Sequence, residues 1–265
     1  MTESKPILSP ESIAPYLNEI GRGSVIHVYP VLESTNSTAK EMAMGGCPHG
    51  SCVIANRQTA GRGRRGRGFY SPPGSGLYFS ILLCTEQLGL EAISTVTAAA
   101  AVLVCRAIEA VSGRRAQIKW VNDVLMEGKK VCGILAEAGP ARENGEAAWV
   151  VVGIGINITT RDFPQELRTT AGSVFGENDE PTAVQSRLAG ELINRLLAPG
   201  ALTDSGIFTE YKERLMLIER CVTVHAPAGD YSAVVRGLEA DYKLIVEKAD
   251  GSLERLFYEE VSLRL

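Results

Sequence analysis

The chain has 265 residues, a formal net charge of −4 and 45% hydrophobic residues, which fits one large domain or a large domain and a small one. The mild acidity argues against a general nucleic-acid binder, because such proteins usually carry a basic face. No apolar run approaches the ~20 residues that span a bilayer, and the polar start "MTESKPILSP" has no hydrophobic signal segment, so no membrane partner is expected.

The first part of the chain predicts a mixture of strands and helices. Ser9 and Pro10 can begin a short helix, with Ser9 as its N-cap. Apolar runs predict strands at 24–32, 51–59 and 76–83. Helices are expected at 34–46, which ends at a Gly-Gly pair, and at 90–113, which ends at Gly113. The second helix is apolar nearly all round, so it should be buried against a sheet.

Two further strand regions begin the second part. Residues 117–138 predict two strands around the turn "EGKK", and 148–158 predict one strand. Amphipathic helices are expected at 183–198 and 206–219. After Arg220, short β-like runs separated by turn sequences predict a small barrel of about five strands. We therefore expect a large domain at 1–218 and a small one at 219–265.

Cysteines and histidines bear on the redox compartment and on metals. None of the six cysteines forms a C-x-x-C pair, and several lie inside apolar runs. Buried, reduced thiols are the plain interpretation, which favours the cytoplasm. The three histidines, His27, His49 and His225, have no metal-ligand spacing, so no metal site is predicted.

The segment "GRGRRGRG" at 61–68 is the most unusual in the chain, with four glycines and four arginines. It contains the letters of a dinucleotide fingerprint, but that motif must open a helix, and Pro72-Pro73 cannot continue one. The remaining interpretations are a solvated loop without a ligand, an RNA-binding segment and a clamp for a small anion. Lys130 favours the clamp, because it begins the apolar run "VCGIL", where a lysine is costly to bury without a negative partner.

Five blocks of sequence together resemble the biotin protein ligases. They are "STN" (34–36), "QTAGRGRRGRGF" (58–69), "KWVNDV" (119–124), "KVCGILAE" (130–137) and "GIGIN" (153–157), in that family's order and at compatible separations. The resemblance covers residues 20–265. It implies an α+β fold: a mixed β-sheet catalytic domain packed with helices, of the class II synthetase-like type, plus a small C-terminal SH3-like β-barrel.

Three departures from the family pattern are visible. Gly68 and Phe69 stand where the family commonly has a polar residue and tryptophan, and Val121 replaces a common proline. Some members carry a winged helix-turn-helix, whereas only residues 1–23 precede the first expected strand here. We therefore expect no DNA partner and no repressor function.

The resemblance implies a two-step reaction with the substrates biotin and ATP, the latter with Mg²⁺. Biotin and MgATP form biotinyl-5′-AMP and pyrophosphate, and a lysine of the biotin carboxyl carrier protein of acetyl-CoA carboxylase, or of a related carboxylase, then attacks the mixed anhydride. Such a chain is a cytoplasmic biotin–[acetyl-CoA-carboxylase] ligase. A lipoate ligase and an RNA-binding protein are the competing interpretations, and monomer and homodimer both stay open.

The resemblance also implies roles for individual residues. The candidate catalytic residues are Lys130, Arg64 and Asp123: the two cations meet the carboxylate and the α-phosphate, and Asp123 orients the attacking amine or is a turn carboxylate. The candidate biotin-binding residues are Ser34, Thr35, Asn36, Gln58, Gly61, Arg62, Gly63, Arg64, Lys130 and Gly153. The candidate ATP-binding residues are Arg64, Arg67, Phe69, Lys119, Asn122 and Asn157.

Several of these residues carry a specific expectation. Asn36 should cap its helix, and Gly153 should let biotin approach the strand backbone. Phe69 should pack on adenine or, alternatively, in the core, and Trp120 should lie in the core. Residues 61–69 should form a lid that is mobile when empty, because glycines lose much entropy on ordering, and that closes over the ligand.

Overall fold

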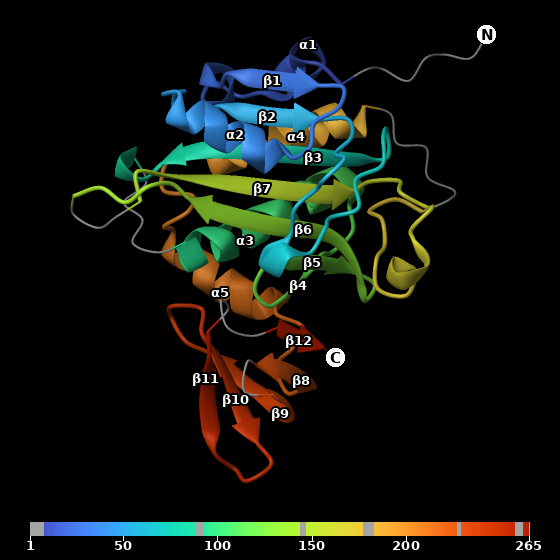
Figure 1. The fold of residues 1–265 in the computed structure, drawn as a ribbon, viewed down its shortest axis with the longest axis vertical. Coiled ribbons are helices and arrows are strands. Elements are labelled where there is room, and N and C mark those ends of the chain that lie inside the picture. Colours follow the sequence, from blue (N-terminus) through green and yellow to red (C-terminus); the bar gives the residue numbers. More distant parts are fainter. Residues whose placement is uncertain are drawn as a thin grey trace.

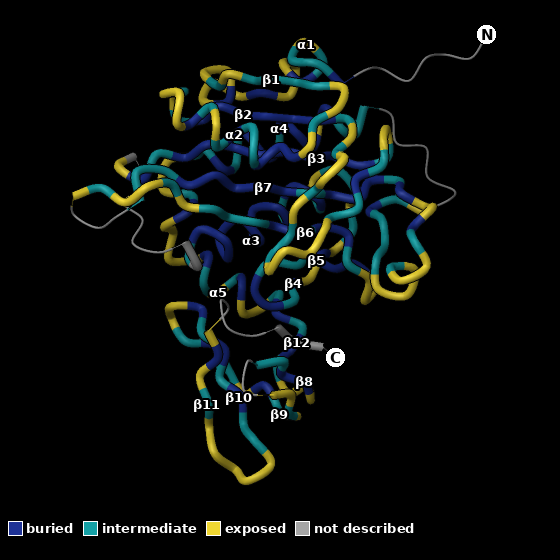
Figure 2. The backbone as a smooth tube through the Cα atoms, viewed as in Figure 1, coloured by how far each residue is buried: buried dark blue, intermediate teal, exposed yellow. Residues whose placement is uncertain are grey.

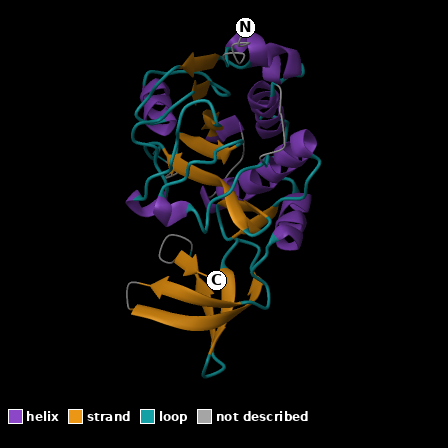
Figure 3. Ribbon diagram, turned by 90° about the vertical axis from the view of Figure 1, so that its right-hand side faces the viewer, coloured by secondary structure: helices purple, strands orange, loops and turns teal. Residues whose placement is uncertain are grey.

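The computed structural model describes residues 8–87, 93–143, 147–176, 183–226, 229–257 and 262–264. In these ranges a large unit combines helices with a β-sheet, and a smaller unit consists of strands (Figure 1). Turning the molecule by 90° shows that the described helices all belong to the large unit (Figure 3). The α+β class predicted from the sequence is confirmed.

A mixed sheet of seven strands forms the centre of the large unit. Its order is β1-β2-β3-β7-β6-β5-β4, in which β1 and β2 are parallel and all other neighbours antiparallel. The strands are β1 (Ile26–Tyr29), β2 (Cys52–Ala55), β3 (Gly76–Cys84), β4 (Gln117–Lys119), β5 (Asp123–Met126), β6 (Lys129–Ala138) and β7 (Trp149–Asn157). Residues 117–138 were predicted to form two strands but form three, because the short β4 precedes β5 and pairs with it.

Helices cover both faces of this sheet. They are α1 (Pro10–Ile13), α2 (Thr35–Met44), α3 (Ile93–Ser112), α4 (Val184–Leu196) and α5 (Ser205–Arg214). Side chains alternate between the faces of a strand, so Ile81 and Val152 join the core around α3, whereas Leu82 and Val151 pack with α2 on the other face. The α2 face is the one that carries the site described below.

The ends of two helices follow the sequence prediction. The Ser9 hydroxyl accepts a hydrogen bond from the Ser12 backbone N–H, and Pro10 occupies the first helical position of α1. Gly113 ends α3 in the left-handed region at φ 67°, and its N–H donates to the Glu109 carbonyl at 2.8 Å.

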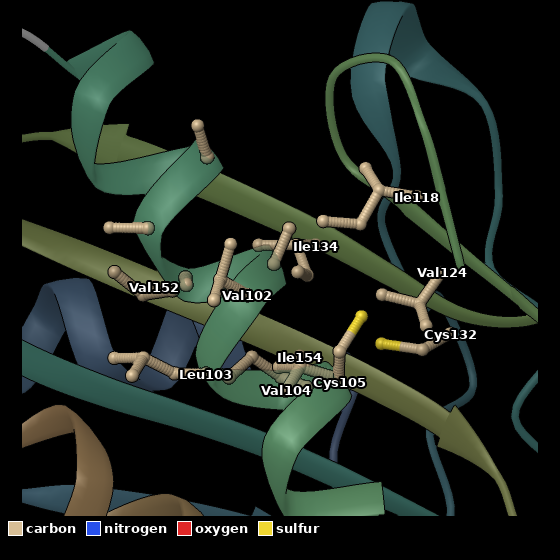
Figure 4. Close-up of a cluster of buried hydrophobic side chains, with 14 of the residues drawn as sticks. Val102, Leu103, Val104, Cys105, Ile118, Val124, Cys132, Ile134, Val152 and Ile154 are labelled. Carbon is tan, nitrogen blue, oxygen red and sulfur yellow. The ribbon is translucent and has the colours of Figure 1, made fainter. Parts of the chain in front are cut away.

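Helix α3 packs its side chains into the core of the large unit (Figure 4). By length and composition its stretch Thr95–Ser112 is apolar enough to cross a membrane, but 67% of it is buried inside the protein. Its apolarity therefore reflects packing against the sheet, as predicted. Figure 4 also shows Cys105 beside Cys132; both are buried and unpaired, and burial raises the pKa of Cys105 to about 12. Cys221, in contrast, is exposed.

The smaller unit is an antiparallel sheet of five strands, in the order β11-β10-β9-β8-β12. Its strands are β8 (Cys221–Ala226), β9 (Gly229–Leu238), β10 (Leu244–Lys248), β11 (Leu253–Leu256) and β12 (Ser262–Arg264). The number of strands predicted after Arg220 is confirmed. The finer assignment, an SH3-like barrel, stays a prediction.

Aromatic side chains join the two units. Trp120 is buried, as predicted, and its indole N–H donates to the Tyr242 carbonyl at 2.8 Å. The ring of Tyr242 packs edge-on against Tyr211 and Phe208 of α5, with centroids 5.2 and 5.5 Å apart. Because Trp120 precedes β5 by only a few residues, this contact lies next to the site described below.

Candidate functional site

A cleft of about 860 Å³ lies on the sheet face that α2 covers. Its floor comes from β6 and β7, one wall from the start of α2, and its cover from residues 61–69, which we call the Gly/Arg loop. The predicted site residues that line it are Ser34, Thr35, Asn36, Gln58, Arg62, Gly63, Arg64, Arg67, Phe69, Lys119, Asn122, Asp123, Lys130 and Gly153. Two predicted residues, Gly61 and Asn157, do not line it.

Two rows of residues across the strands shape the floor. Ser80, Gly153 and Leu135 are cross-strand neighbours on β3, β7 and β6, and in the next row Gly155 pairs with Gly133. A Cβ atom on Gly153 would lie 2.0 Å from Asn36 Oδ1, so this glycine makes room for a protein side chain. Gly153 also lines the cleft, and the expected close approach of biotin to the strand at this residue stays a prediction.

Phe69 fills the corresponding space over the second row. A Cβ on Gly155 would lie 2.5 Å from the Phe69 ring, and one on Gly133 would lie 3.2 Å from it. The Phe69 ring also contacts Tyr78 edge-on, with centroids 6.5 Å apart. Phe69 thus lies on the cleft floor and lines it, and its stacking on adenine stays a prediction.

The start of α2 forms a buried polar wall, by which we mean Ser34, Thr35, Asn36, Gln58, Ser80 and Glu137. Ser34 is the N-cap by its extended backbone, yet its side chain makes no capping bond. Instead, Gln58 Oε1 accepts from the Thr35 backbone N–H at 2.8 Å. The prediction that Asn36 caps the helix was wrong: Asn36 Nδ2 donates to the Leu135 carbonyl at 3.1 Å and to Glu137 at 2.9 Å.

Glu137 was missed by the sequence reasoning. It ends the block "KVCGILAE" and lies on the cleft face of β6, two residues after Leu135, so strand alternation alone could have indicated it. Lys40 of α2 lies 2.8 Å from its carboxylate, and Arg62 of the Gly/Arg loop lies 3.2 Å away. Burial alone would raise the pKa of Glu137, but the hydrogen bonds from Lys40 and Asn36 and the charge of Arg62 outweigh burial and lower it.

Backbone hydrogen bonds close the Gly/Arg loop like a hairpin. The Phe69 N–H donates to the Gly61 carbonyl at 2.8 Å, and the Gly63 N–H donates to the Arg67 carbonyl at 2.7 Å. The tip uses the left-handed region at Arg65, with φ 57°, and at Gly66, with φ 70°. A Cβ on Gly61 would lie 2.5 Å from the Phe69 carbonyl oxygen, so a glycine is needed here for the loop to close. Gly61 was expected to bind biotin, but it does not line the cleft.

A β-bulge directs Lys130 into the cleft. The register between β5 and β6 shifts so that Val124 pairs with Cys132 but Leu125 pairs with Lys130, which leaves Val131 as an extra residue. Val131 joins the core, and Lys130 therefore faces the cleft, where its Nζ lies 2.6 Å from Asp123 Oδ1. An ammonium beside a carboxylate is thus held at one end of the cleft.

Asn122 anchors the Gly/Arg loop above this pair. Its Nδ2 donates to the Ile134 carbonyl at 2.8 Å, and its backbone carbonyl accepts from the Ile134 N–H at 2.9 Å. Its Oδ1 accepts from Arg64 at 3.1 Å. Asn122 lines the cleft, and these bonds show that it positions Arg64. Its direct contact with ATP stays a prediction.

Residues 165–170 form a rim that no sequence signal indicated. Glu166, Leu167, Thr169 and Thr170 line the cleft. The Lys130 N–H donates to the Thr170 carbonyl at 2.8 Å, which ties the rim to the start of β6. The expected ATP ligand Asn157 lies behind this rim, buried, with Nδ2 donating to the Gly172 carbonyl at 3.1 Å; its expected adenine contact finds no support in this position.

Among the described residues, no three His, Cys, Asp or Glu side chains gather in a group that could hold a metal ion. The carboxylates that line the cleft are Asp123 and Glu166. A metal that arrives already bound to a phosphate ligand would meet these two.

The fold and the cleft define a class of protein: an α+β domain with a cleft between a lysine, a Gly/Arg loop and a buried polar wall. The model of the biotin/lipoate A/B protein ligase family matches residues 28–157 of this chain.

Individual relatives agree with this assignment. "Bifunctional ligase/repressor BirA" of Bacillus subtilis (strain 168) is 39% identical over 175 residues, which are 65% of this chain and 50% of that protein, so the chain spans about half the length of that relative. The "Biotin--[acetyl-CoA-carboxylase] ligase" of Mycobacterium tuberculosis is 29% identical over 254 residues, covering 92% of this chain and 91% of that protein. The solved "Biotin protein ligase from Aquifex aeolicus in complex with biotin and ATP" matches with a TM-score of 0.76 and 26% identity, covering 91% of this chain and 98% of that chain.

Proposed function

We propose that this chain is a biotin–protein ligase that uses MgATP to activate biotin and then biotinylates a lysine of a carboxyl carrier domain. The observation that carries the proposal is the arrangement of the cleft. Lys130 is directed into it by a β-bulge, Arg64 is held above it by Asn122, and a buried polar wall forms its other end. The solved relative in complex with biotin and ATP supports the same pair of ligands.

The first step requires cations because two anions must approach each other. A carboxylate oxygen of biotin attacks the α-phosphorus of ATP, the bond to the β-phosphate oxygen breaks, and pyrophosphate leaves with the bonding electrons. Lys130 and Arg64 stabilise the negative charge that gathers on the α-phosphate, while Arg67 and Lys119 bind the other phosphates. Asp123 and Glu166 are the carboxylates of the cleft lining that would hold the Mg²⁺ of MgATP, which would neutralise phosphate charge there.

In the second step an amine attacks the acyl carbon of biotinyl-5′-AMP, AMP leaves, and an amide forms. Asp123 orients this amine, since its carboxylate already holds one ammonium, that of Lys130, at 2.6 Å. The Gly/Arg loop covers the anhydride meanwhile and excludes water. Arg62, Gly63 and Arg64 lie over biotin, and Phe69 packs on the adenine ring.

A buried polar wall favours biotin over lipoate as the acid. The ureido ring of biotin offers N–H donors and a carbonyl acceptor, whereas the dithiolane ring of lipoate offers no hydrogen-bond donor. Thr35 and Gln58 are both at the cleft, and with lipoate bound their oxygens would keep their bonds within the wall but gain no donor from the ligand. Ser34 completes this end of the cleft.

The finer assignments follow from this function. The catalytic unit is placed at 1–218 and an SH3-like domain at 219–265, with the carrier protein of acetyl-CoA carboxylase or a related carboxylase as acceptor. A cytoplasmic location agrees with six unpaired cysteines, and both monomer and homodimer are compatible with the proposal.

Intact-mass measurement of a carrier domain tests the proposal. The purified chain is incubated with biotin, MgATP and the domain, and in parallel with lipoate in place of biotin. We expect the domain to gain one biotinyl group and no lipoyl group. A lipoyl gain without a biotinyl gain would favour the lipoate ligase, and no gain with either acid would contradict the proposal.

A further inference from the structure

A continuous chain of hydrogen bonds connects Glu137 with the cleft through the polar wall. Asn36 Nδ2 lies 2.9 Å from Glu137 Oε2, Asn36 Oδ1 lies 2.6 Å from Ser80 Oγ, and Ser80 Oγ lies 2.8 Å from Thr35 Oγ1. Ser80 is fully buried, and Asn36 and Thr35 are each 4% exposed. Water therefore cannot easily supply alternative partners, and each group must satisfy its neighbour.

The direction of each bond in this chain is set at its start by two acceptors, the ionised Glu137 carboxylate and the Leu135 carbonyl. Glu137 can only accept, and so can the Leu135 carbonyl, which lies 3.1 Å from the same Asn36 atom. Only the NH₂ group of Asn36 can face two acceptors, so its carbonyl oxygen must face Ser80. That oxygen cannot donate, and the single hydroxyl proton of Ser80 is therefore used in this bond.

Thr35 is consequently left as an acceptor. Ser80 has no second proton, so it cannot donate to Thr35 as well. The Thr35 hydroxyl donates its one proton to Ser80 at 2.8 Å in preference to the more distant Gln58 Oε1 at 3.2 Å. Its Oγ1 also lies 3.2 Å from Gln58 Oε1, which itself accepts from the Thr35 backbone N–H. With the Thr35 proton held by Ser80, the oxygens of Thr35 and Gln58 are both left to accept from a ligand, and Gln58 Oε1 is the other acceptor within reach of that proton.

The orientation of Gln58 is fixed independently of Glu137. Gln58 Nε2 donates to Ser71 Oγ at 2.9 Å, and the Ser71 hydroxyl donates to the Phe69 carbonyl at 3.0 Å. Of the two acceptors, only Thr35 therefore depends on the chain that begins at Glu137. Lys40 and Arg62 keep that carboxylate in place and ionised, and the lowered pKa of Glu137 agrees with this.

We propose that Glu137 is a positioning residue that fixes the Thr35 hydroxyl as a hydrogen-bond acceptor, so that the cleft selects a ligand with an N–H donor at this point. The inference rests on the proposed function, in which the donor is a ureido N–H of biotin. An isosteric ligand with a ring oxygen at the same place would set two acceptors against each other and be rejected.

The Glu137→Gln variant tests the direction of the chain most sharply. Lys40 and Arg62 both approach Oε1, so the carbonyl oxygen of the new amide takes that position and its NH₂ faces Asn36. Asn36 then relieves the contact between two NH₂ groups by turning its oxygen to the new NH₂ and its own NH₂ to Ser80, at the cost of its bond to the Leu135 carbonyl. The Ser80 proton is released toward Thr35, whose hydroxyl proton becomes available to the ligand. The variant should therefore accept a ligand with a ring oxygen.

The experiment measures the Kd of biotin and of its two cyclic carbamate analogues, in each of which one ureido N–H is replaced by oxygen. We expect the wild type to prefer biotin over one analogue by about 100-fold, as sites built around a ligand N–H do. Glu137→Gln and Ser80→Ala should reduce this ratio at least about tenfold. Thr35→Val should weaken biotin binding and leave the binding of that analogue unchanged. Ser186→Ala, which removes another buried serine hydroxyl far from the cleft, should keep the wild-type ratio.

Two results would overturn the inference in distinguishable ways. If Glu137→Gln and Ser80→Ala bind biotin more weakly but keep the wild-type ratio, Glu137 is only structural and the proposed function stands. If the wild-type chain binds neither biotin nor an analogue, the proposed function fails as well. Should Glu137→Gln not fold, the ratio in Ser80→Ala and Thr35→Val decides the same question.

Discussion

The two sides of the cleft are built in opposite ways. The polar wall is buried and mostly uncharged, and its groups are held by one another; Ser34, Thr35 and Asn36 are each at most 4% exposed. The Gly/Arg loop is exposed along most of its length and carries four arginines (Figure 2). One side is rigid before any ligand arrives, and the other concentrates charge on a backbone with many glycines.

This difference matches the two parts of the proposed ligand. A neutral ring with fixed donors and acceptors is selected best by fixed partners, because every misplaced polar atom costs free energy in a buried site. A reactive anhydride with a phosphate instead needs cations that approach after binding and then shut out water. Under the proposed function, selection and catalysis are therefore carried out at different ends of the cleft.

Lys130→Ala should have the largest effect, since it removes the charge at the catalytic end and leaves the polar wall intact. We expect adenylate formation to slow by about 10²–10³-fold with a smaller loss of biotin affinity. Lys129→Ala is the matched control, because Lys129 is exposed and does not line the cleft. Single-turnover formation of biotinyl-5′-AMP is the measurement. Equal, mild effects of both substitutions would show that Lys130 is merely a charge at a strand end.

Gly153→Ala should disrupt the polar wall, at the other end of the cleft from Lys130. The new Cβ would lie 2.0 Å from Asn36 Oδ1, so Asn36 must move and the hydrogen bonds of the polar wall are lost. We expect biotin affinity to fall by about 10–100-fold and the free energy of unfolding to fall by about 1–3 kcal/mol. Calorimetric titration and denaturant unfolding measure the two. Gly23→Ala, where a Cβ meets nothing within 4 Å, should change neither, and a tolerated Gly153→Ala would refute the close packing described here.

Hydrogen exchange compares the two sides without any substitution. Amides of the Gly/Arg loop should exchange quickly in the empty protein and become protected when biotinyl-5′-AMP is bound. Amides of β3 and β7, which support the polar wall, should be protected in both states. Strong and equal protection of residues 61–69 with and without ligand would contradict the role of the loop as a lid.

Much of this arrangement could be predicted from the sequence, because it depends on local patterns. The strands, the buried helix α3 and the residues next to the glycine motifs were found where alternation and turn residues placed them. The bulge at Val131 was not predictable, since it depends on the register between β5 and β6. Gly61 and Asn157 were expected at the site but do not line the cleft. A sequence motif does not indicate which of its residues face the cleft.

Glu137 could be predicted from the sequence only in part. Its position on the cleft face follows from alternation along β6, but its partners Lys40 and Arg62 come from a helix and a loop that only the folded chain brings there. The rim at 165–170 gave no signal at all, because its contact with β6 is made by backbone atoms that any sequence has.

Acid titration of stability should give the smallest effect. The pKa of Glu137 is lowered in the folded protein, so its contribution is present above the unfolded pKa and is lost as the pH falls through the folded pKa. We expect Glu137→Gln to lower the free energy of unfolding by about 1 kcal/mol at pH 7 and by progressively less as the pH falls through the folded pKa, so its loss of stability in acid is less steep. Arg65→Gln in the exposed loop should leave the pH dependence of unfolding unchanged. If the free energy of unfolding falls equally steeply with decreasing pH in the wild type and in Glu137→Gln, the result would argue against a paired carboxylate.

Biotin-dependent exchange of labelled pyrophosphate into ATP tests the proposed function most directly, because it reports the reversible first step without a carrier protein. The account predicts exchange with biotin and MgATP, none without biotin, none with lipoate, and a rate reduced by about 10²–10³-fold in Lys130→Ala. Exchange that requires lipoate in place of biotin, or exchange at the wild-type rate in Lys130→Ala, would contradict it.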